Sequence, residues 1–215
     1  MKKYITIFLS LLFISFQSAK AEFAIGLTGA YHMLDASGTE TTRQSNEKNS
    51  GSHSEEVIVP EIFLEASADN GTVFGLAYIP TRDVGAKSRS DSNSDGDTGT
   101  YTADAELDNV VQIYVDVPVT EYLGSTVYVK AGIQHATIAT LESLNSGSTY
   151  PNKDVLGLTL GLGAKGDLPY GNNLFYKADL TYTDFEDYEA TSSADNKVSA
   201  ELEDIAVKFS IGYKF

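Results

Sequence analysis

The sequence contains no cysteine, so neither a disulfide framework nor thiol chemistry is available to this protein. Basic residues are scarce: 15 lysines and arginines stand against 30 aspartates and glutamates, a formal net charge of −15. A chain this acidic repels nucleic acid and suits cations or basic partners better. Beyond residue 21 no apolar stretch approaches the ~20 residues of a membrane-crossing helix, so we expect no helical span there.

The start of the chain has the pattern of a secretory signal peptide. Two lysines follow the initial methionine, an apolar run covers residues 5–16, and Ala19-x-Ala21 supplies the small residues of a cleavage site. We therefore predict a signal peptide at 1–21 and a single domain at 22–215. Cleavage removes three lysines and leaves 12 basic residues against 30 acidic ones, a net charge of −18.

From Glu22 onward, apolar residues alternate with small or polar ones. Phe23, Ile25 and Leu27 share one face of the first segment, and this period of two is typical of a β-strand rather than a helix. The same alternation predicts eight strands, at 22–33, 57–68, 72–80, 110–119, 127–133, 154–165, 174–182 and 205–215.

The connections between these strands alternate in length. Long polar stretches at 35–55, 82–104, 139–153 and 186–199 are separated by short turns, which indicates an up-and-down meander of even strand number. Pro60 falls inside the second strand, where it removes a ladder hydrogen bond, so we expect a bulge there.

The two faces of the predicted strands differ in chemistry. The apolar face is continuous, whereas the opposite face is rich in glycine and threonine with scattered charge, which suits a narrow interior. Aromatic residues gather near both ends of the apolar face, and two such girdles are typical of a transmembrane barrel. The fold prediction is therefore all-β: an eight-stranded antiparallel up-and-down transmembrane β-barrel. The alternative is a secreted lipocalin-like barrel that buries its apolar face.

The last strand ends in an aromatic residue after a strict alternation. In this strand Phe209, Ile211, Tyr213 and Phe215 lie on one face, and the chain here resembles the small bacterial outer-membrane barrels of the OmpA transmembrane-domain, OmpX, OmpW and opacity-protein kind. The resemblance implies export through the signal peptide to the cell outer membrane, contact with outer-membrane lipid, and these four residues as the signal read by the barrel-assembly machinery. No motif selects one subfamily.

Charged residues also occur on the face that the barrel would enclose. Buried charges must be paired, because one unpaired ion costs several kcal/mol. We expect either a structural ionic plug or a gate for a thin ion path, in which a pair such as Glu65 and Lys130 exchanges partners. The predicted lumen charges are Glu61, Glu65, Asp116, Lys130, Lys165, Lys177, Asp179 and Lys208.

The stretch from Asp91 to Asp97 resembles the start of a calcium loop. Asp91, Asn93, Asp95 and Asp97 alternate, but the twelfth position of an EF-hand, which requires glutamate, is Thr102. This stretch is therefore no EF-hand, and we expect an outer turn that binds a divalent cation weakly at best.

Other catalytic or metal-binding patterns are weak. His32, His53 and His135 lie far apart in the sequence, so a zinc site would need the fold to bring them together. A lipid-modifying site can be imagined only where His135 precedes Glu142 and Ser143. We therefore predict no enzyme activity and no cofactor.

The expected function is a structural and surface-interaction role, with both chain termini facing the periplasm and four long acidic loops facing outward. Binding would reside in those loops, since exposed loops on a rigid scaffold commonly carry function. The alternatives are a narrow porin-like channel for small solutes or ions and, less favoured, an outer-membrane lipid-modifying enzyme.

Overall fold

The computed structural model describes residues 22–43, 46–91, 99–141, 149–169 and 173–215. The predicted signal peptide lies outside these residues. The strands are β1 (Glu22–Thr41), β2 (Lys48–Ser67), β3 (Val73–Ile79), β4 (Arg82–Asp91), β5 (Gly99–Tyr122), β6 (Ser125–Thr140), β7 (Lys153–Asp167), β8 (Leu174–Phe185), β9 (Tyr188–Thr191) and β10 (Lys197–Lys214). Among the described residues, no helix is long and apolar enough to cross a membrane.

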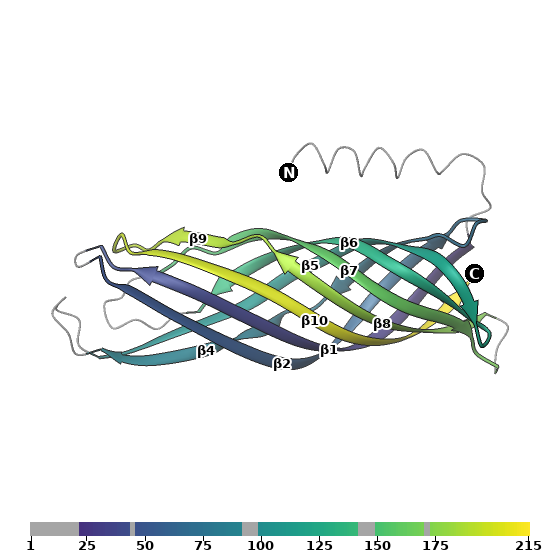
Figure 1. Ribbon diagram of the computed structural model, residues 1–215, viewed down its shortest axis with the longest axis horizontal. Coiled ribbons are helices and arrows are strands. Elements are labelled where there is room, and N and C mark those ends of the chain that lie inside the picture. Colours follow the sequence, from purple (N-terminus) through teal and green to yellow (C-terminus); the bar gives the residue numbers. More distant parts are fainter. Residues whose placement is uncertain (1–21, 44–45, 92–98, 142–148, 170–172) are drawn as a thin grey trace.

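These strands close into one antiparallel barrel (Figure 1). The order around the wall is β1-β2-β3-β5-β6-β7-β8-β10, and the pairing of β1 with β10 closes the ring. The short strand β4 follows β3 and pairs with β5, while β9 follows β8 and pairs with β10, so the wall is a ring of 8 strands. The predicted fold class is confirmed.

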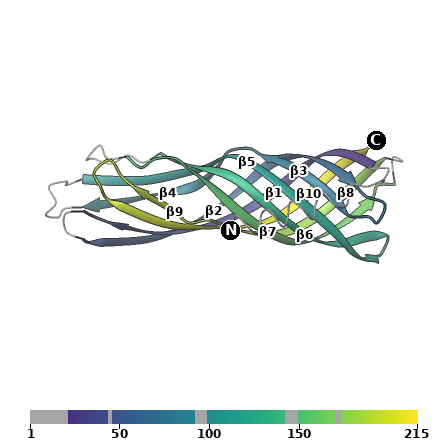
Figure 2. The ribbon, with the colours of Figure 1, turned by 90° about the horizontal axis from the view of Figure 1, so that it is seen from above.

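The barrel is longer than the sequence predicted. Two of the stretches expected as long loops, 35–55 and 82–104, are mostly strand, because β1 and β2 each have 20 residues and β5 has 24. A transmembrane strand needs only ~9–11 residues. The barrel therefore has an inner half, which holds both ends of the ring-forming chain, and an outer half, which contains β4, β9 and the far ends of β1, β2, β5 and β10 (Figure 2).

The polarity of the wall reverses between the two halves. In the inner half Leu27 pairs with Ile62 on one side and Ile211 on the other, and all three side chains are exposed on the outside of the wall. In the outer half the exterior is polar and the interior is apolar. The stretches 35–55 and 82–104 were predicted as loops because strands were recognised by an apolar outer face. In the outer half the apolar face points inward instead.

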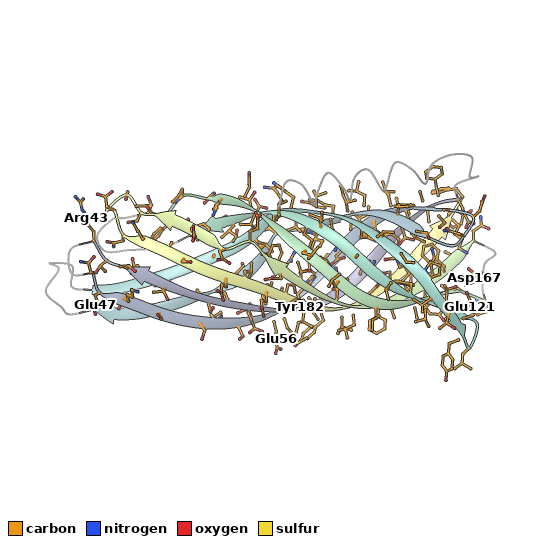
Figure 3. The ribbon with its side chains drawn as sticks, turned by 45° about the horizontal axis from the view of Figure 1, so that its top comes forward. Arg43, Glu47, Glu56, Glu121, Asp167 and Tyr182 are labelled. Atoms are coloured by element: carbon orange, nitrogen blue, oxygen red, sulfur yellow. The ribbon has the colours of Figure 1, made fainter. Side chains whose placement is uncertain are left out.

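Two tyrosines mark the edge of the apolar exterior. Tyr31 donates a hydrogen bond to the carboxylate of Glu56, and Tyr182 donates one to Glu203 at 2.8 Å (Figure 3). Exposed carboxylates do not belong in hydrocarbon, so the apolar band ends at this level.

The expected bulge at Pro60 is not present. The register of β2 with β1 runs through Pro60 without a shift, whereas the ladder between β2 and β3 ends at Ile62 and Tyr78. Continued by two residues, that register would place Pro60 opposite Pro80. Neither residue has an N–H to donate, so the ladder stops there.

Beyond this point β2 and β4 share no ladder pair among the described residues. The line between them, called the β2/β4 seam below, is closed by side chains. The ring of His53 on β2 lies over Gly85 on β4, where any larger side chain would collide with it.

Glycines in the inner half make room for aromatic side chains. Gly75 on β3 lies against the ring of Tyr114, and Gly163 on β7 lies against the ring of Tyr128. A Cβ at either glycine would overlap the ring. The wall glycines therefore allow large side chains to lie flat inside a narrow barrel.

Candidate functional site

An inner charge cluster fills the lumen of the inner half. It consists of three carboxylates and three amines contributed by β2, β5, β6, β7 and β8: Glu65, Asp116, Asp179, Lys130, Lys165 and Lys177. Formal charges therefore balance within the cluster.

Lys177 is the centre of this cluster. Its Nζ bridges Glu65 and Asp116, with 2.7 Å to Asp116 Oδ2. Lys130 Nζ is 3.0 Å from Asp116 Oδ1 and 3.4 Å from Asp179, and Lys165 Nζ is 3.2 Å from Glu65. Each buried ion thus has at least one partner of opposite charge, as burial requires.

Two tyrosines add hydroxyl donors to carboxylate oxygens that already face a lysine amine. Tyr114 donates a hydrogen bond to Glu65 and Tyr128 donates one to Asp179, both at 2.8 Å. The amine of Lys130 also lies 3.7 Å from the centre of the Tyr114 ring, a cation–π contact. These are the two rings that lie against the wall glycines, so wall packing positions the cluster.

An outer charge cluster follows toward the outer half. Lys208 Nζ is 2.7 Å from Glu61 Oε1, and a nitrogen of Arg82 is 3.0 Å from Asp204 Oδ2. His32 is fully buried between them, with Nε2 3.2 Å from Glu61 and Nδ1 2.9 Å from Asp204. One histidine therefore links the two ion pairs.

A small cavity lies between the two clusters. Its volume is about 20 Å³, which holds roughly one water molecule. Polar groups from both clusters line it, together with Thr28, Ser210 and Gln112.

The lumen of the outer half is filled by apolar side chains, called the apolar plug below. These side chains come from every strand of the wall and are all buried: Leu34, Val59, Ile79, Val84, Leu107, Val110, Ala136, Ile138, Val155, Phe185, Tyr188 and Leu202. The barrel interior is therefore occupied at two levels, by charge pairs and then by an apolar core.

No family model matches the chain, and no curated protein matches it in sequence. Solved structures do match. Outer membrane protein OprG of Pseudomonas aeruginosa is 15% identical with a TM-score of 0.55, covering 93% of this chain and 98% of its own. Ail of Yersinia pestis is 13% identical with a TM-score of 0.45, covering 91% of this chain and 99% of its own. Outer membrane protein AlkL is 11% identical with a TM-score of 0.48, covering 92% of this chain and 91% of its own.

This chain has the fold of the small outer-membrane barrels. At these identities the likeness concerns the fold alone. The predicted resemblance is confirmed at that level, and the functional residues must be argued from the chain itself.

The structure places all eight predicted lumen charges inside the barrel. Seven of them are buried and Lys165 is nearly so. The pair suggested from the sequence, Glu65 with Lys130, does not form: Glu65 pairs with Lys165 and Lys177, and Lys130 pairs with the two aspartates.

Sequence reasoning missed three members of the outer charge cluster. Arg82 was assigned to a polar connection, Asp204 fell just before the last predicted strand, and His32 was treated as an isolated histidine. Asp204 could have been found, because Ile205 points outward and the preceding residue of a strand must point inward. No sequence signal places Arg82, since the chain between β3 and β4 leaves the regular strand pattern at Pro80.

The predicted metal ligands are only partly described. Asp91 is the last residue of β4, while Asn93, Asp95 and Asp97 lie outside the described residues. Within the described part of the chain, no group of three or more His, Cys, Asp or Glu side chains could hold a metal ion.

The structure describes only the histidine of the imagined lipid-modifying site. His135 is exposed on the outside of β6, on the opposite side of the wall from the buried His32. Glu142 and Ser143 lie outside the described residues.

The proposed assembly residues lie on the outside of the closing strand. Phe209, Ile211 and Tyr213 of β10 are exposed, as is Phe215 after it. The N–H of Phe215 donates a 2.9 Å hydrogen bond to the carbonyl of Phe23, so the end of the chain is fixed to the first strand.

Proposed function

We propose that this protein is a non-conducting barrel of the cell outer membrane that holds a rigid acidic platform above the membrane surface. The observation that carries the proposal is the doubly filled lumen. An ion entering from the inner end meets the paired charges. Beyond them, the only polar side-chain group of the apolar plug is the Tyr188 hydroxyl, which already donates to the Pro151 carbonyl, so nothing there replaces the water shell of the ion.

The exterior of the outer half supports a surface-interaction role. Acidic side chains face solvent on neighbouring strands, including Asp35 of β1, Glu201 and Glu203 of β10, and Glu189 of β9. Because the strands themselves carry these groups, the platform is more rigid than loops would be. It suits basic or cationic partners at the cell surface.

Conductance of the refolded protein in planar bilayers tests the non-conducting role. We expect no discrete channel openings under symmetric salt. A variant with Leu107→Ser and Val110→Ser puts polar groups into the apolar plug, and Lys177→Met opens the inner charge cluster; neither change alone should permit current. Steady openings of the unaltered protein would contradict the proposal.

A narrow channel is the second candidate, favoured by the cavity between the charge clusters. In this case exchange of partners around Lys177 would open a thin path. It predicts openings whose frequency changes with Lys177→Met but not with Lys214→Met, whose amine pairs with the exposed Asp167 at the periplasmic end.

Binding of oligolysine tests the platform. Glu201→Gln with Glu203→Gln removes two outer carboxylates without touching the lumen, and we expect weaker, less salt-dependent binding. Glu121→Gln, at the opposite end of the barrel, is the matched control. Equal binding by all three proteins would contradict the assigned surface.

The proposal also covers export, assembly into the outer membrane and cation binding. Residues 1–21 direct export, and the exposed face from Phe209 to Phe215 presents the signal to the barrel-assembly machinery. Weak divalent-cation binding at 91–97 is retained as a proposal, with calorimetry on Asp95→Ala plus Asp97→Ala as its test.

A further inference from the structure

The turn between β5 and β6 has an unusual residue at its tip. Tyr122 pairs with Ser125, so Leu123 and Gly124 alone make the turn, with φ of 50° and 80°. Two-residue turns with both φ positive strongly prefer Asn-Gly, because a branched side chain is disfavoured in the left-handed region.

Leucine is the exception even within this chain. Four described non-glycine residues have positive φ, and the other three are Asn46, Asn109 and Asp195, the residue types that tolerate this conformation. The neighbouring hairpin between β2 and β3 has a longer turn at 69–71, in which Gly71 takes the positive φ. At position 123 the backbone therefore favours asparagine, and a leucine must be explained by something else.

Packing within the barrel does not explain it. Leu123 is 88% exposed and Tyr122 is 67% exposed. Strain at an exposed apolar residue points to a contact outside the chain.

The position of the turn identifies that contact. The tip continues the apolar exterior of β5, where Val117 and Val119 are also exposed. The hairpin bends away from the barrel axis at the end that holds the C-terminus, and its residue Glu121 is labelled in Figure 3. A tip aimed sideways at the edge of the apolar band faces lipid rather than the space beneath the barrel.

We propose that the β5–β6 turn is an interfacial lipid anchor, in which Leu123 and Tyr122 enter the boundary between headgroups and acyl chains of the periplasmic leaflet. Tyrosine suits this boundary because its ring is apolar and its hydroxyl is polar. The polar residues next to the turn stay on its water-facing side, where Thr126 donates a 2.6 Å hydrogen bond to the carboxylate of Glu121. The anchor is independent of whether the lumen conducts.

The absence of tryptophan and cysteine from the chain makes single probes possible. Leu123→Trp, refolded in lipid nanodiscs that expose both faces, is the test protein. Leu160→Trp, on the apolar band, and Asp195→Trp, in an outer turn, are the deep and aqueous references. We expect Leu123→Trp to show blue-shifted emission and quenching by lipids brominated near the headgroup. Emission and quenching equal to those of Asp195→Trp would overturn the proposal.

A smaller probe removes the affinity of tryptophan itself for interfaces. Leu123→Cys should react several-fold more slowly with a membrane-impermeant maleimide in nanodiscs than Asp195→Cys, and at the same rate once both are unfolded in urea. Rapid labelling in nanodiscs with slow labelling in intact envelopes would mean that a periplasmic protein covers the turn, and that outcome also overturns the lipid assignment.

Discussion

Replacing Lys177 by methionine tests whether the inner charge cluster stabilises the barrel. Methionine keeps the length of the side chain but removes the amine that bridges Glu65 and Asp116. The cluster then holds two amines against three carboxylates, all enclosed by the wall. Removing one partner of a buried charge pair typically costs about 3–5 kcal/mol, because the remaining charge is left without compensation.

The matched control is Lys165→Met. Lys165 lies at the edge of the cluster and contacts only one carboxylate, Glu65, which keeps Lys177 and the Tyr114 hydroxyl. We expect a loss of about 1 kcal/mol for this variant, close to that of a partly exposed pair. The difference between the two lysines is therefore the informative quantity.

The assay is urea unfolding in lipid vesicles, followed by far-UV circular dichroism and by the change in gel mobility between folded and unfolded barrel. Adding Asp116→Asn to Lys177→Met restores the charge balance and should recover part of the lost stability, with a coupling of about 1–3 kcal/mol. If both lysine variants lose the same stability, or if Asp116→Asn gives no rescue, Lys177 is not the energetic centre of the inner charge cluster.

Three further predictions concern the wall. Leu160→Arg should cost about 2–4 kcal/mol in bilayers because the side chain faces lipid; unchanged unfolding would mean that the inside and outside faces are reversed. Gly75→Ala should cost about 1–3 kcal/mol through its collision with the Tyr114 ring, whereas Gly29→Ala, with nothing within 4 Å of the added carbon, should be nearly neutral. Deleting Phe215 should slow assembly into the outer membrane without preventing refolding into detergent, and equal rates of assembly in cells would remove its role as a signal.

The inner half of the barrel was predictable from sequence because one rule governs it. Lipid outside and a narrow lumen inside force apolar and small or charged residues to alternate, so Glu65, Lys130 and Lys177 could be assigned to the lumen by counting along each strand. Their pairing could not be predicted, because it depends on how far strands are staggered around the ring. Lys177 reaches Glu65 across the barrel from a strand that is not its neighbour.

The outer half was harder to predict because its strands have the polarity of a water-soluble protein. Leu34 and Leu202 are apolar and point inward, while Asp35 and Glu203 point outward. Read as a continuation of the lipid-facing pattern, such a segment has no apolar exterior and is taken for a loop. The strands continue, but their exterior faces water instead of lipid, so the alternation no longer places apolar residues on the outside.

The facing prolines at 60 and 80 have a consequence for motion. On the side of β1, strand β2 is paired along its whole length, whereas on its other side the pairing stops at Ile62. One strand therefore belongs to two cooperative units with different opening energies. Hydrogen exchange along β2 should divide at this point: amides below it are released only when the whole barrel unfolds, and seam-facing amides above it exchange through local opening. In such a platform β2 and β4 can separate along the seam while the inner half of the barrel, held in the membrane, stays closed.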